Sequence, residues 1–359
     1  MKVLGIESSC DETAASVVED GRKLLSNVVH TQIDIHAQYG GVVPEVAARS
    51  HIEVINPVIN QALNDAGCSW DDIDAIAVTY APGLIGSLLV GTLAARTLAV
   101  VKNKPVYPIH HVEAHVYANF ITEQSDHLSL TLPSKQPEFP MLALIVSGGH
   151  SQLVLFHGHG NYELLGQTQD DAVGEAFDKV AKIIGLPYPG GPSIAKAATS
   201  GDPHKYRLPK SKLQNPYDFS FSGLKTATLR AVQAETGVDY TFPSHELAAR
   251  LTDVQRVDFA ASFQHIAIET LVDKAEKAFR DYTPASVVIA GGVAANQELR
   301  RQLSDRLPIT VEYAPMQLCT DNGAMIATLG YYYAQKKEAT SPYDLEVVPC
   351  LSMTKTAWA

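Results

Sequence analysis

Two histidines four residues apart carry the clearest chemical signal in this sequence. The segment HHVEAH at 110–115 places His111 and His115 at positions i and i+4. On a helix this spacing brings both imidazoles to one face, one turn apart, where they can bind the same metal ion. The zinc peptidase motif HExxH has a glutamate after its first histidine as general base, but Val112 occupies that position here. The spacing permits a metal site and disfavours a peptidase site, but taken alone it is also explained by a pair of ordinary surface or core histidines.

An acidic residue far along the chain is the best candidate for a third ligand. Asp321, in CTDNGA at 319–324, stands at the start of a helix expected over 322–334. An aspartate at that place is also a common N-cap, which alone would explain it. The sequence leaves both roles open, and one side chain can have both.

Two short polar turns have the composition of anion-binding loops. SSCDET at 8–13 and SGGH at 147–150 each lie between two expected strands. Their small residues let backbone N–H groups approach an anion closely, as in phosphate-binding nests. A plain hairpin turn is the alternative for either one alone, but two turns at equivalent places favour anion binding. Asp11 and Glu12 in the first turn are candidate phosphate contacts.

The order of strand, polar turn and returning strand occurs twice, at 2–18 and at 141–156, with starts roughly 140 residues apart. A duplicated α/β lobe with a cleft between the copies is the simplest explanation. The expected domains are an N-terminal lobe at 1–110, a C-terminal lobe at 111–335 with helical insertions at about 170–285, and a peripheral tail at 336–359. Other expected elements are helices at 43–66, 83–101, 171–184, 223–235, 244–279 and 295–307, strands at 75–79 and 286–290, and loops at 122–140 and 201–216.

Composition narrows the class of protein. With 359 residues, 46% of them hydrophobic, the chain can bury a large core in two lobes. The net charge of −11 argues against nucleic-acid binding through a broadly basic surface, so such a substrate would need a local basic patch or a partner. The four cysteines show no CxxC pairing, which fits a reducing cytoplasm. Arg96 interrupts the longest apolar stretch, 83–101, so we expect a packed helix there and no membrane span.

Two further segments have residues suited to a nucleotide or another small substrate. AGGVAAN at 290–296 follows an expected buried strand and opens a helix, where a base or ribose can lie against glycine backbone. Ordinary tight strand-to-helix packing is the alternative. Asp170 and Asp171 are explained by the start of a helix, whereas Asp178 lies two turns further in and is the better candidate for a substrate contact. Gly191, in the following PGGP, offers close backbone approach.

Taken together, these motifs resemble the TsaD family, the tRNA threonylcarbamoyladenosine transferases once labelled O-sialoglycoprotein endopeptidases. The resemblance runs from about Lys2 to Gln335, and it implies a two-lobed actin-like ATPase fold of the ASKHA class with ribonuclease-H-like lobes. The segments that carry it are GIESSCDET (5–13), HHVEAH (110–115), IVSGGHSQL (145–153), DDAVGEAFDKVAKIIGLPYPGGP (170–192), AGGVAAN (290–296) and CTDNGAMIA (319–327).

The resemblance implies an acyltransferase. It would move threonylcarbamoyl from threonylcarbamoyl-AMP to the N6 amine of the adenosine immediately 3′ of the anticodon, in tRNAs that read codons beginning with adenosine. The implied metal is Fe²⁺, with Zn²⁺ as the alternative, and the implied nucleotide is the donor itself or ATP/ADP. The implied metal ligands, which act in catalysis through the metal, are His111, His115 and Asp321. The implied substrate contacts are Ile145, Val146, Ser147, Gly148, Gly149, Asp178, Gly191 and Asn296.

The resemblance also implies partners and a place in the cell. Family members work with a degenerate paralogue, TsaB, and a small P-loop ATPase, TsaE, in the cytoplasm and without a membrane. A tRNA-facing surface is the family interpretation of one basic cluster, and a solvated loop is the other. The cluster comprises His204, Lys205, Arg207, Lys210 and Lys212, beside Tyr206 and the aromatic run at 217–221.

Three positions depart from the family pattern. Ala14 stands where members often carry serine, Ala81 where glycine precedes the proline, and Ala195 where many carry aspartate. If that aspartate bonds a ribose hydroxyl in other members, the contact is absent here or is supplied elsewhere. The metal ligands and the glycine turns are unaffected.

The implied chemistry needs no nucleophilic side chain, because the donor is already an activated mixed anhydride. A bound metal can polarise the donor carbonyl, and backbone N–H groups at 147–149 can meet its phosphate or the developing oxyanion. An actin-like small-molecule kinase would need an aspartate beside the second polar turn, where this chain has His150. A metal-dependent peptidase lacks its glutamate at Val112. A non-enzymatic paralogue would lack the metal ligands.

Overall fold

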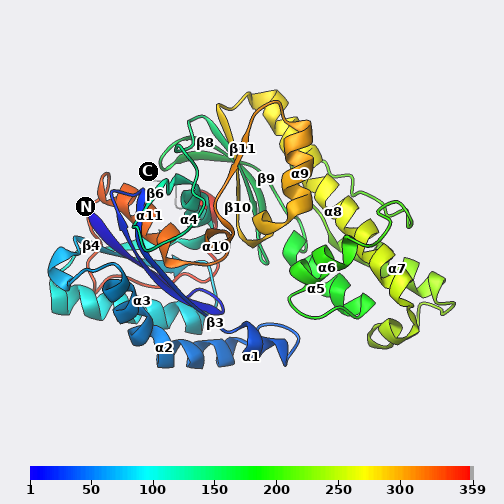
Figure 1. The fold of residues 1–359 in the computed structure, drawn as a ribbon, viewed down its shortest axis with the longest axis horizontal. Coiled ribbons are helices and arrows are strands. Elements are labelled where there is room, and N and C mark those ends of the chain that lie inside the picture. The colour runs from blue at the N-terminus through cyan, green and yellow to red at the C-terminus, as the bar shows by residue number, and fades with distance from the viewer. Residues whose placement is uncertain (356–359) are drawn as a thin grey trace. The chain divides into compact units, whose positions relative to one another are not determined.

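The computed structural model describes residues 1–355 and divides into two compact units. The first unit comprises Met1–Glu138, Gly158–Asn161 and the chain from Glu312 onward, and the second comprises Phe139–His157 and Tyr162–Val311. Each unit is an α/β unit built on one sheet (Figure 1). This division differs from the expected lobes at 1–110 and 111–335, because the helices that follow residues 110 and 322 pack with the first sheet.

The first sheet has six strands in the order β5-β4-β1-β2-β3-β6. The hairpin strands β1 and β2 pair antiparallel, and β4 pairs parallel with β1 on its other side. The central strands are buried on both faces and therefore read as near-continuous apolar runs, such as VLGI at 3–6. The strands are β1 (Lys2–Glu7), β2 (Glu12–Glu19), β3 (Lys23–Thr31), β4 (Ala75–Ala81), β5 (Val106–His110) and β6 (Glu123–Gln124).

Helices cover both faces of the first sheet. Leu4 and Ile6 point into a core with α2 (Pro44–Asp65) and α3 (Ile85–Lys102). Gly5, whose position on the strand faces the other way, lies against α11 (Gly323–Ala334). The shorter helical elements of this unit are α1 (Ile33–Ala37), α4 (His111–Tyr117), α10 (Met316–Cys319) and the 3₁₀ turns η1 (Trp70–Asp72), η2 (Ala118–Phe120) and η5 (Met353–Lys355).

The second sheet repeats the pairing of the first. Its order is β11-β10-β7-β8-β9, and β7 pairs antiparallel with β8 and parallel with β10, as β1 does with β2 and β4. This shared pairing confirms the predicted repeat of strand, turn and returning strand. The strands are β7 (Met141–Val146), β8 (Ser151–Gly158), β9 (Asn161–Gln167), β10 (Ser286–Ala290) and β11 (Val311–Tyr313).

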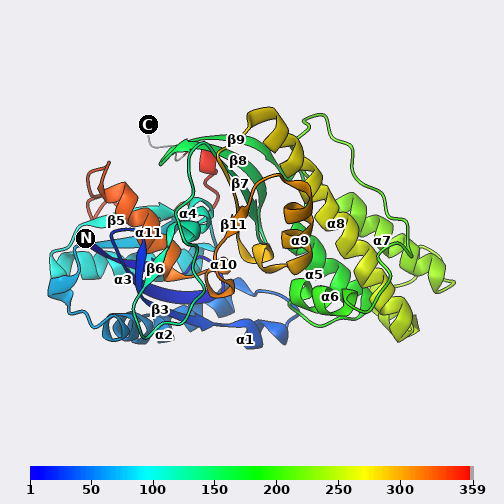
Figure 2. The same ribbon diagram turned by 45° about the horizontal axis from the view of Figure 1, so that its top comes forward.

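The helices of the second unit include α8, a helix of 30 residues that packs against α6 and α9 (Figure 2). The prediction of one helix over 244–279 was wrong at its start. A 3₁₀ turn, η3 (Ser244–Arg250), comes first, and a capping box between Thr252 and Gln255 begins the α-helix. The helical elements are α5 (Val173–Ile184), α6 (Gly190–Ala198), α7 (Ser222–Glu235), α8 (Asp253–Tyr282), η4 (Gly292–Ala295) and α9 (Gln297–Arg306).

The described part of the expected tail packs on the first unit. Thr340 forms an isolated bridge to Val106, Leu345 is buried, and Arg96 of α3 donates hydrogen bonds to the carbonyls of Tyr343 and Leu345. Residues 336–355 are therefore peripheral in position and ordered by these contacts. The predicted loops at 122–140 and 201–216 contain no helix, and β6 is their one strand.

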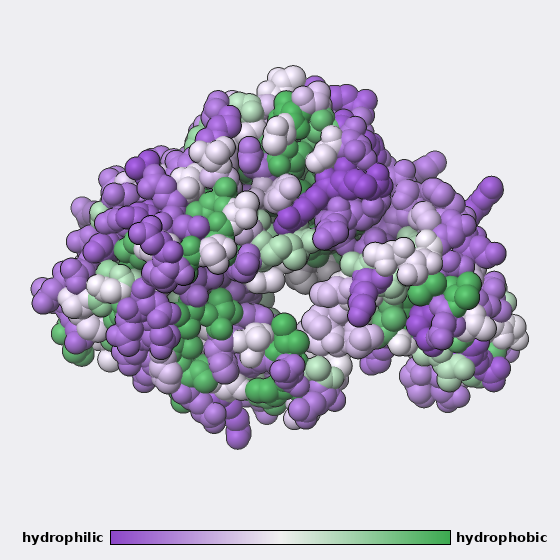
Figure 3. Space-filling view, in the orientation of Figure 1, coloured by the Kyte–Doolittle hydropathy of each residue, from purple (hydrophilic) through white to green (hydrophobic). Residues whose placement is uncertain are grey.

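Helix α3 is long and apolar enough to cross a membrane by length and composition alone, with 33% of its window buried. Its inner face packs on α2 and β4 through residues that include Ser87, Gly91 and Thr92. Its outer face exposes Leu89 and Leu93, and Figure 3 shows hydrophobic residues among hydrophilic ones over the region of α1 to α3. The inner-face contacts agree with the predicted packed helix.

Candidate metal centre

The two predicted histidines lie on one face of α4, as their spacing requires. The strand β5 ends at His110, whose Nδ1 accepts a hydrogen bond from the backbone N–H of Glu113 and so caps the helix that begins at His111. Both candidate ligands are buried, with 8% of His111 and 2% of His115 exposed. Their ring centroids are 4.7 Å apart and their planes are inclined at 76°.

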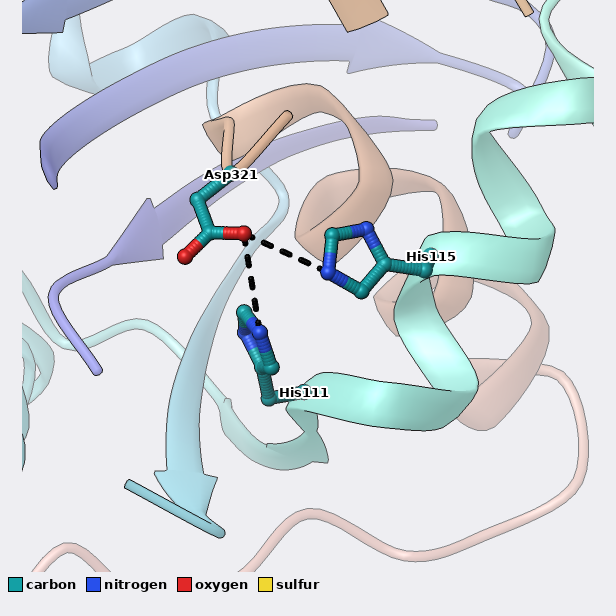
Figure 4. A group of neighbouring side chains, drawn as sticks. All are labelled: His111, His115 and Asp321. Atoms are coloured by element: carbon teal, nitrogen blue, oxygen red, sulfur yellow. Dashed lines mark ion pairs between the residues drawn. The ribbon is translucent and has the colours of Figure 1, made fainter. Parts of the chain in front are cut away.

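Asp321 joins the two histidines, and it is not the N-cap that the sequence also allowed. Asn322 is the cap of α11, because its Oδ1 accepts from the backbone N–H of Met325 at 3.0 Å. Figure 4 shows the Asp321 carboxylate directed at both imidazoles. Asn322 thus caps α11, whereas the neighbouring side chain of Asp321 faces the two histidines.

The spacing of the three side chains fits one metal ion. Asp321 Oδ1 lies 3.6 Å from His111 Nε2 and 3.3 Å from His115 Nε2, and a set of ligand atoms, one from each residue, lies within 4.8 Å. Ligands about 2.1 Å from a tetrahedral ion are about 3.4 Å apart. The buried Nε2 of His115 makes no hydrogen bond among the described residues, and Asp321 is its charged neighbour, so this nitrogen is available to a metal ion. Two imidazoles and a carboxylate suit iron or zinc.

Close packing of two glycines sets the position of Asp321. A Cβ on Gly5 would lie 2.2 Å from the carbonyl oxygen of Gly323, and a Cβ on Gly323 would lie 2.6 Å from the backbone nitrogen of Ser16. Only glycine at both positions lets the first turn of α11 approach the β1–β2 hairpin this closely. The residue just before that turn is thereby held beside α4.

Glu7, the last residue of β1, is a component of the site that the sequence analysis missed. Its Oε2 lies 3.0 Å from His111 Nδ1, and the side chain is fully buried. Burial alone would raise its pKa, but the charge and hydrogen bond of His111 and the hydroxyl of Thr79 outweigh burial, so the pKa lies below its usual range. A buried carboxylate requires a partner. The signal that could have found it is an acidic residue closing an otherwise apolar strand.

The electrostatic field at the centre favours positive charge. Burial lowers the pKa of His111, but the carboxylates of Asp321 and Glu7 reverse this effect and raise it to about 9. The two carboxylates flank the imidazole, 3.6 Å and 3.0 Å from its two nitrogens. Without another cation, a proton on His111 supplies the balancing charge, and a bound metal cation can replace that proton.

The first polar turn is held rigidly beside the centre. His51 of α2 links Thr13 Oγ1 at 2.7 Å to the carbonyl oxygen of Cys10 at 3.0 Å. Ser8 donates to the carbonyl of Ser87, and the Ser87 hydroxyl donates to Cys10. These buried bonds to α2 and α3 fix the backbone of the turn.

Glu12, one of the two candidate phosphate contacts, lies in the field of Asp321 and of the other candidate, Asp11. The pKa of Glu12 is raised to about 10 by burial first and then by the charges of Asp321 and Asp11. Glu12 is therefore protonated at neutral pH in this arrangement, and Thr31 donates to its Oε1 at 3.3 Å. A protonated carboxyl can donate a hydrogen bond to a phosphate oxygen, whereas an ionised one repels it.

The second polar turn belongs to the second unit and presents free backbone donors. The carbonyls of Ser147 and Gly148 accept from the first backbone N–H groups of α5, at Gly174 and Glu175. Within residues 1–355, the N–H groups of Gly148 and Gly149 have no acceptor. A Cβ at either glycine would meet nothing within 4 Å. The packing does not require glycine there, but close approach of a ligand would.

The AGGVAAN segment lies directly against this turn. Gly291 has φ +89, and a Cβ there would lie 2.4 Å from the carbonyl oxygen of Val146 and 3.3 Å from Ser147. Both the backbone angle and the close contact require glycine. Ile145 and Val146 are buried residues of β7, so they offer backbone rather than side chains to a ligand.

The remaining candidate contacts are also in the second unit. Asp178 Oδ1 accepts from the backbone N–H of Gly190 at 2.6 Å, which fixes the PGGP turn against α5. Gly191 next to it has open space where a Cβ would be. Asn296 caps α9 and donates to Gln264 at 3.0 Å. Asp178 and Asn296 thus have structural bonds, whichever ligand they contact.

Asp170 and Asp171 do not lie in the first turn of a helix as predicted, because α5 begins later, at Val173. Each instead has other structural partners. Asp170 accepts hydrogen bonds from Ser220 and from the backbone N–H of Phe221 at the start of α7. Asp171 pairs with lysines 179 and 225.

Similarity to known proteins agrees with the fold. Two solved structures share the fold at 14% and 16% sequence identity: HypF from T. kodakarensis (TM-score 0.58; 93% of this chain, 48% of that one) and component A of the (R)-2-hydroxyglutaryl-CoA dehydratase of Acidaminococcus fermentans (TM-score 0.50; 94% and 100%). The chain therefore has the predicted actin-like ATPase fold.

The family is shown by sequence. The model of the TsaD family, described as tRNA N6-adenosine threonylcarbamoyltransferase, matches residues 23–328. The chain is 50% identical to the protein of that name from Thermomicrobium roseum (97% of this chain, 95% of the relative) and 49% identical to that from Symbiobacterium thermophilum (98% and 96%). The chain belongs to the TsaD family of transferases, as its motifs predicted.

Proposed function

We propose that the chain is a tRNA-modifying acyltransferase, and the His-His-Asp group in a member of the TsaD family is the observation that carries this proposal. Its substrates are threonylcarbamoyl-AMP and tRNA. The acceptor is the N6 amine of the adenosine immediately 3′ of the anticodon, in tRNAs that read codons beginning with adenosine. The names of the closely similar relatives support the acceptor and the group transferred.

His111, His115 and Asp321 are the proposed metal ligands, with Fe²⁺ as the metal and Zn²⁺ as the alternative. The spacing of their ligand atoms supports this assignment, as does the buried Nε2 of His115, which makes no hydrogen bond within residues 1–355. When bound, such an ion supplies Lewis acidity toward an oxygen of the donor. The protein's own contribution is a buried pair of histidines held beside the carboxylates of Asp321 and Glu7.

The second polar turn is the proposed phosphate site for the donor. The N–H groups of Gly148 and Gly149, which have no acceptor in the described part of the chain, provide two hydrogen-bond donors, and the open space beside both glycines allows a phosphate to approach. Gly191 and Asn296 are proposed contacts for the rest of the nucleotide. Asp11 and Glu12 stay predicted contacts for phosphate.

The transfer needs no covalent enzyme intermediate. The N6 nitrogen of adenosine attacks the carbonyl carbon of the donor and forms the new C–N bond. The bond from that carbon to the phosphate oxygen breaks, AMP leaves with the electron pair, and the amine loses one proton to solvent. Hydrogen bonds that grow stronger as charge moves onto the phosphate favour this step.

Three exposed cations on the 201–216 segment are the proposed contact for tRNA phosphates. Tyr206 stacks on Phe259 with centroids 3.7 Å apart, and Leu208 is buried, so the alternate residues Lys205 and Arg207 point outward. Lys212 is likewise exposed. The three cations that carry this surface, Lys205, Arg207 and Lys212, have no ion pair among the described residues.

Other members of the predicted basic cluster are less available. Lys210 pairs with Glu269 and Asp273, and His204 packs on His265. In the aromatic run beside the cluster, Phe219 and Phe221 are fully buried and cannot stack on bases. Phosphate contacts, rather than base contacts, are the role that the remaining side chains fit.

Replacement of the three cations by glutamine tests this surface. A plot of the logarithm of the tRNA binding constant against the logarithm of the salt concentration has a negative slope. Loss of three phosphate contacts should make this slope less steep by about 2. The double variant Arg49→Gln and Lys104→Gln removes two cations of the first unit as a control. An unchanged slope in the triple variant would exclude the segment from the tRNA interface.

We further propose that the chain acts in the cytoplasm with a paralogue like TsaB and a P-loop ATPase like TsaE, which consumes ATP. The deciding experiment incubates the purified chain with threonylcarbamoyl-AMP and unmodified tRNA, with and without these partners, followed by nucleoside mass spectrometry. Threonylcarbamoyladenosine should form only when the donor is present. Metal-dependent peptide cleavage or phosphate transfer from ATP to a small molecule, without tRNA modification, would favour the peptidase or the kinase instead.

A further inference from the structure

We propose that Glu7 is a positioning residue of the metal centre, which holds the His111 ring so that Nε2 faces the metal. This inference rests on the proposed metal-binding role of His111. The two nitrogens of that ring have separate carboxylate neighbours. Nδ1 lies 3.0 Å from Glu7 Oε2, and Nε2 lies 3.6 Å from Asp321 Oδ1, on the side shared with His115.

The carboxylate determines which nitrogen carries hydrogen. An ionised carboxylate only accepts, so Glu7 selects the form of His111 with hydrogen on Nδ1 and a lone pair on Nε2. The nearby hydroxyl of Ser9, 3.1 Å from the same Nδ1, can donate or accept and so selects neither form. Glu7 is therefore the group that orients His111 for binding through Nε2, an arrangement common at metal-bound histidines.

Glu7 is itself held in place by two further bonds. The backbone N–H of Ser9 donates to Oε1 at 2.5 Å, and Thr79 Oγ1 donates to Oε2 at 2.5 Å. With His111, three donors surround a side chain that has no exposed surface. Burying a charge at this point costs free energy, and an apolar residue would close the strand without that cost. A role that requires the charge, such as orienting His111, explains the carboxylate at this position.

The Glu7→Gln variant tests the inference because it keeps the shape and removes the charge. The glutamine can turn its N–H₂ toward Nδ1, which stabilises the form of His111 with hydrogen on Nε2 and blocks that nitrogen as a ligand. Loss of such an outer carboxylate typically weakens metal binding by about 10- to 100-fold. Glu53→Gln makes the same change at an exposed glutamate of α2, is the matched control, and should leave the affinity for metal unchanged.

The assay titrates the metal-depleted full-length chain with Co²⁺ and follows the visible absorption of the bound ion. Thermal unfolding with a chelator present measures the stability of the fold independently of metal binding. The inference predicts a rise of 10- to 100-fold in the Co²⁺ dissociation constant of Glu7→Gln, with a changed absorption band. Wild-type affinity and band in Glu7→Gln would overturn it.

A measurement on the unaltered protein covers the case in which Glu7→Gln does not fold. Nitrogen NMR of the ¹⁵N-histidine-labelled chain with Zn²⁺ should show His111 bound through Nε2, with hydrogen on Nδ1. Binding through Nδ1 would contradict the inference. The double variant His111→Ala and His115→Ala separates the two proposals: if it still binds Co²⁺ as the wild type does, the metal centre itself is wrong.

Discussion

The Gly5→Ala variant should disturb the metal centre from a distance. A Cβ on Gly5 would lie 2.2 Å from the carbonyl oxygen of Gly323 and 2.5 Å from the backbone nitrogen of Ala327. Both are backbone atoms of α11, so no side-chain rotation relieves the contact. The helix must move by about 1 Å to restore a normal separation.

That movement is large on the scale of metal coordination. Asp321 precedes α11 by two residues and should move with it, whereas ligand distances at a metal site tolerate deviations of about 0.2 Å. Overpacking of this kind costs about 1–3 kcal/mol of stability. We therefore expect Gly5→Ala to unfold at a temperature several degrees lower with chelator present and, beyond that, to bind Co²⁺ at least tenfold more weakly.

The assay compares three proteins by thermal unfolding in chelator and by Co²⁺ titration: wild type, Gly5→Ala and Gly223→Ala. Gly223 lies in α7, and a Cβ there would have the Ser211 hydroxyl 3.6 Å away, an ordinary contact. Its replacement should leave metal binding unchanged and stabilise the helix by about 0.5–1 kcal/mol. If Gly5→Ala kept wild-type metal affinity, the argument that glycine packing positions Asp321 would be refuted.

Two other predictions concern pH and the phosphate site. Burial first, and then Lys336, lower the pKa of His159 from 6.5 to about 4, so its contribution to stability is complete above pH 6.5 and lost as the pH falls toward 4. The stability difference between wild type and His159→Gln, from urea unfolding, should shrink over that interval, and a constant difference would contradict the assignment. Gly149→Val should leave the unfolding midpoint unchanged, because its Cβ enters open space, yet weaken ADP binding at least tenfold in calorimetry. Unchanged ADP binding would remove Gly149 from the phosphate site.

Periodicity and motif spacing were sufficient to predict the repeated unit and the histidine pair. The i, i+4 spacing of His111 and His115 depends only on helix geometry, and α4 provides it. The repeat could be found because hairpin strands and their turns are local in sequence. The helix start at 253 was missed because the apolar pattern continues through the 3₁₀ turn at 244–250, and only the capping box marks the boundary.

The features that could not be predicted from the sequence depend on contacts between residues far apart in the chain. Glu7 is 104 residues from His111, and no local pattern connects a strand end to a helix so far away. The choice between Asn322 and Asp321 as helix cap depends on which side chain faces α4, and this follows from the approach of Gly323 to the β1–β2 hairpin. The division of the chain into units likewise reflects packing of α4 and α11, which the order of elements does not reveal.

The most direct test of the account measures metal content and tRNA modification together in the His111→Ala, His115→Ala double variant. The purified variant and the wild type are analysed for bound metal, and each is then incubated with threonylcarbamoyl-AMP, unmodified tRNA and the partner proteins before nucleoside mass spectrometry. The account predicts that the folded variant has lost its metal and forms no threonylcarbamoyladenosine. Modified tRNA at the wild-type rate from the metal-free variant would contradict it.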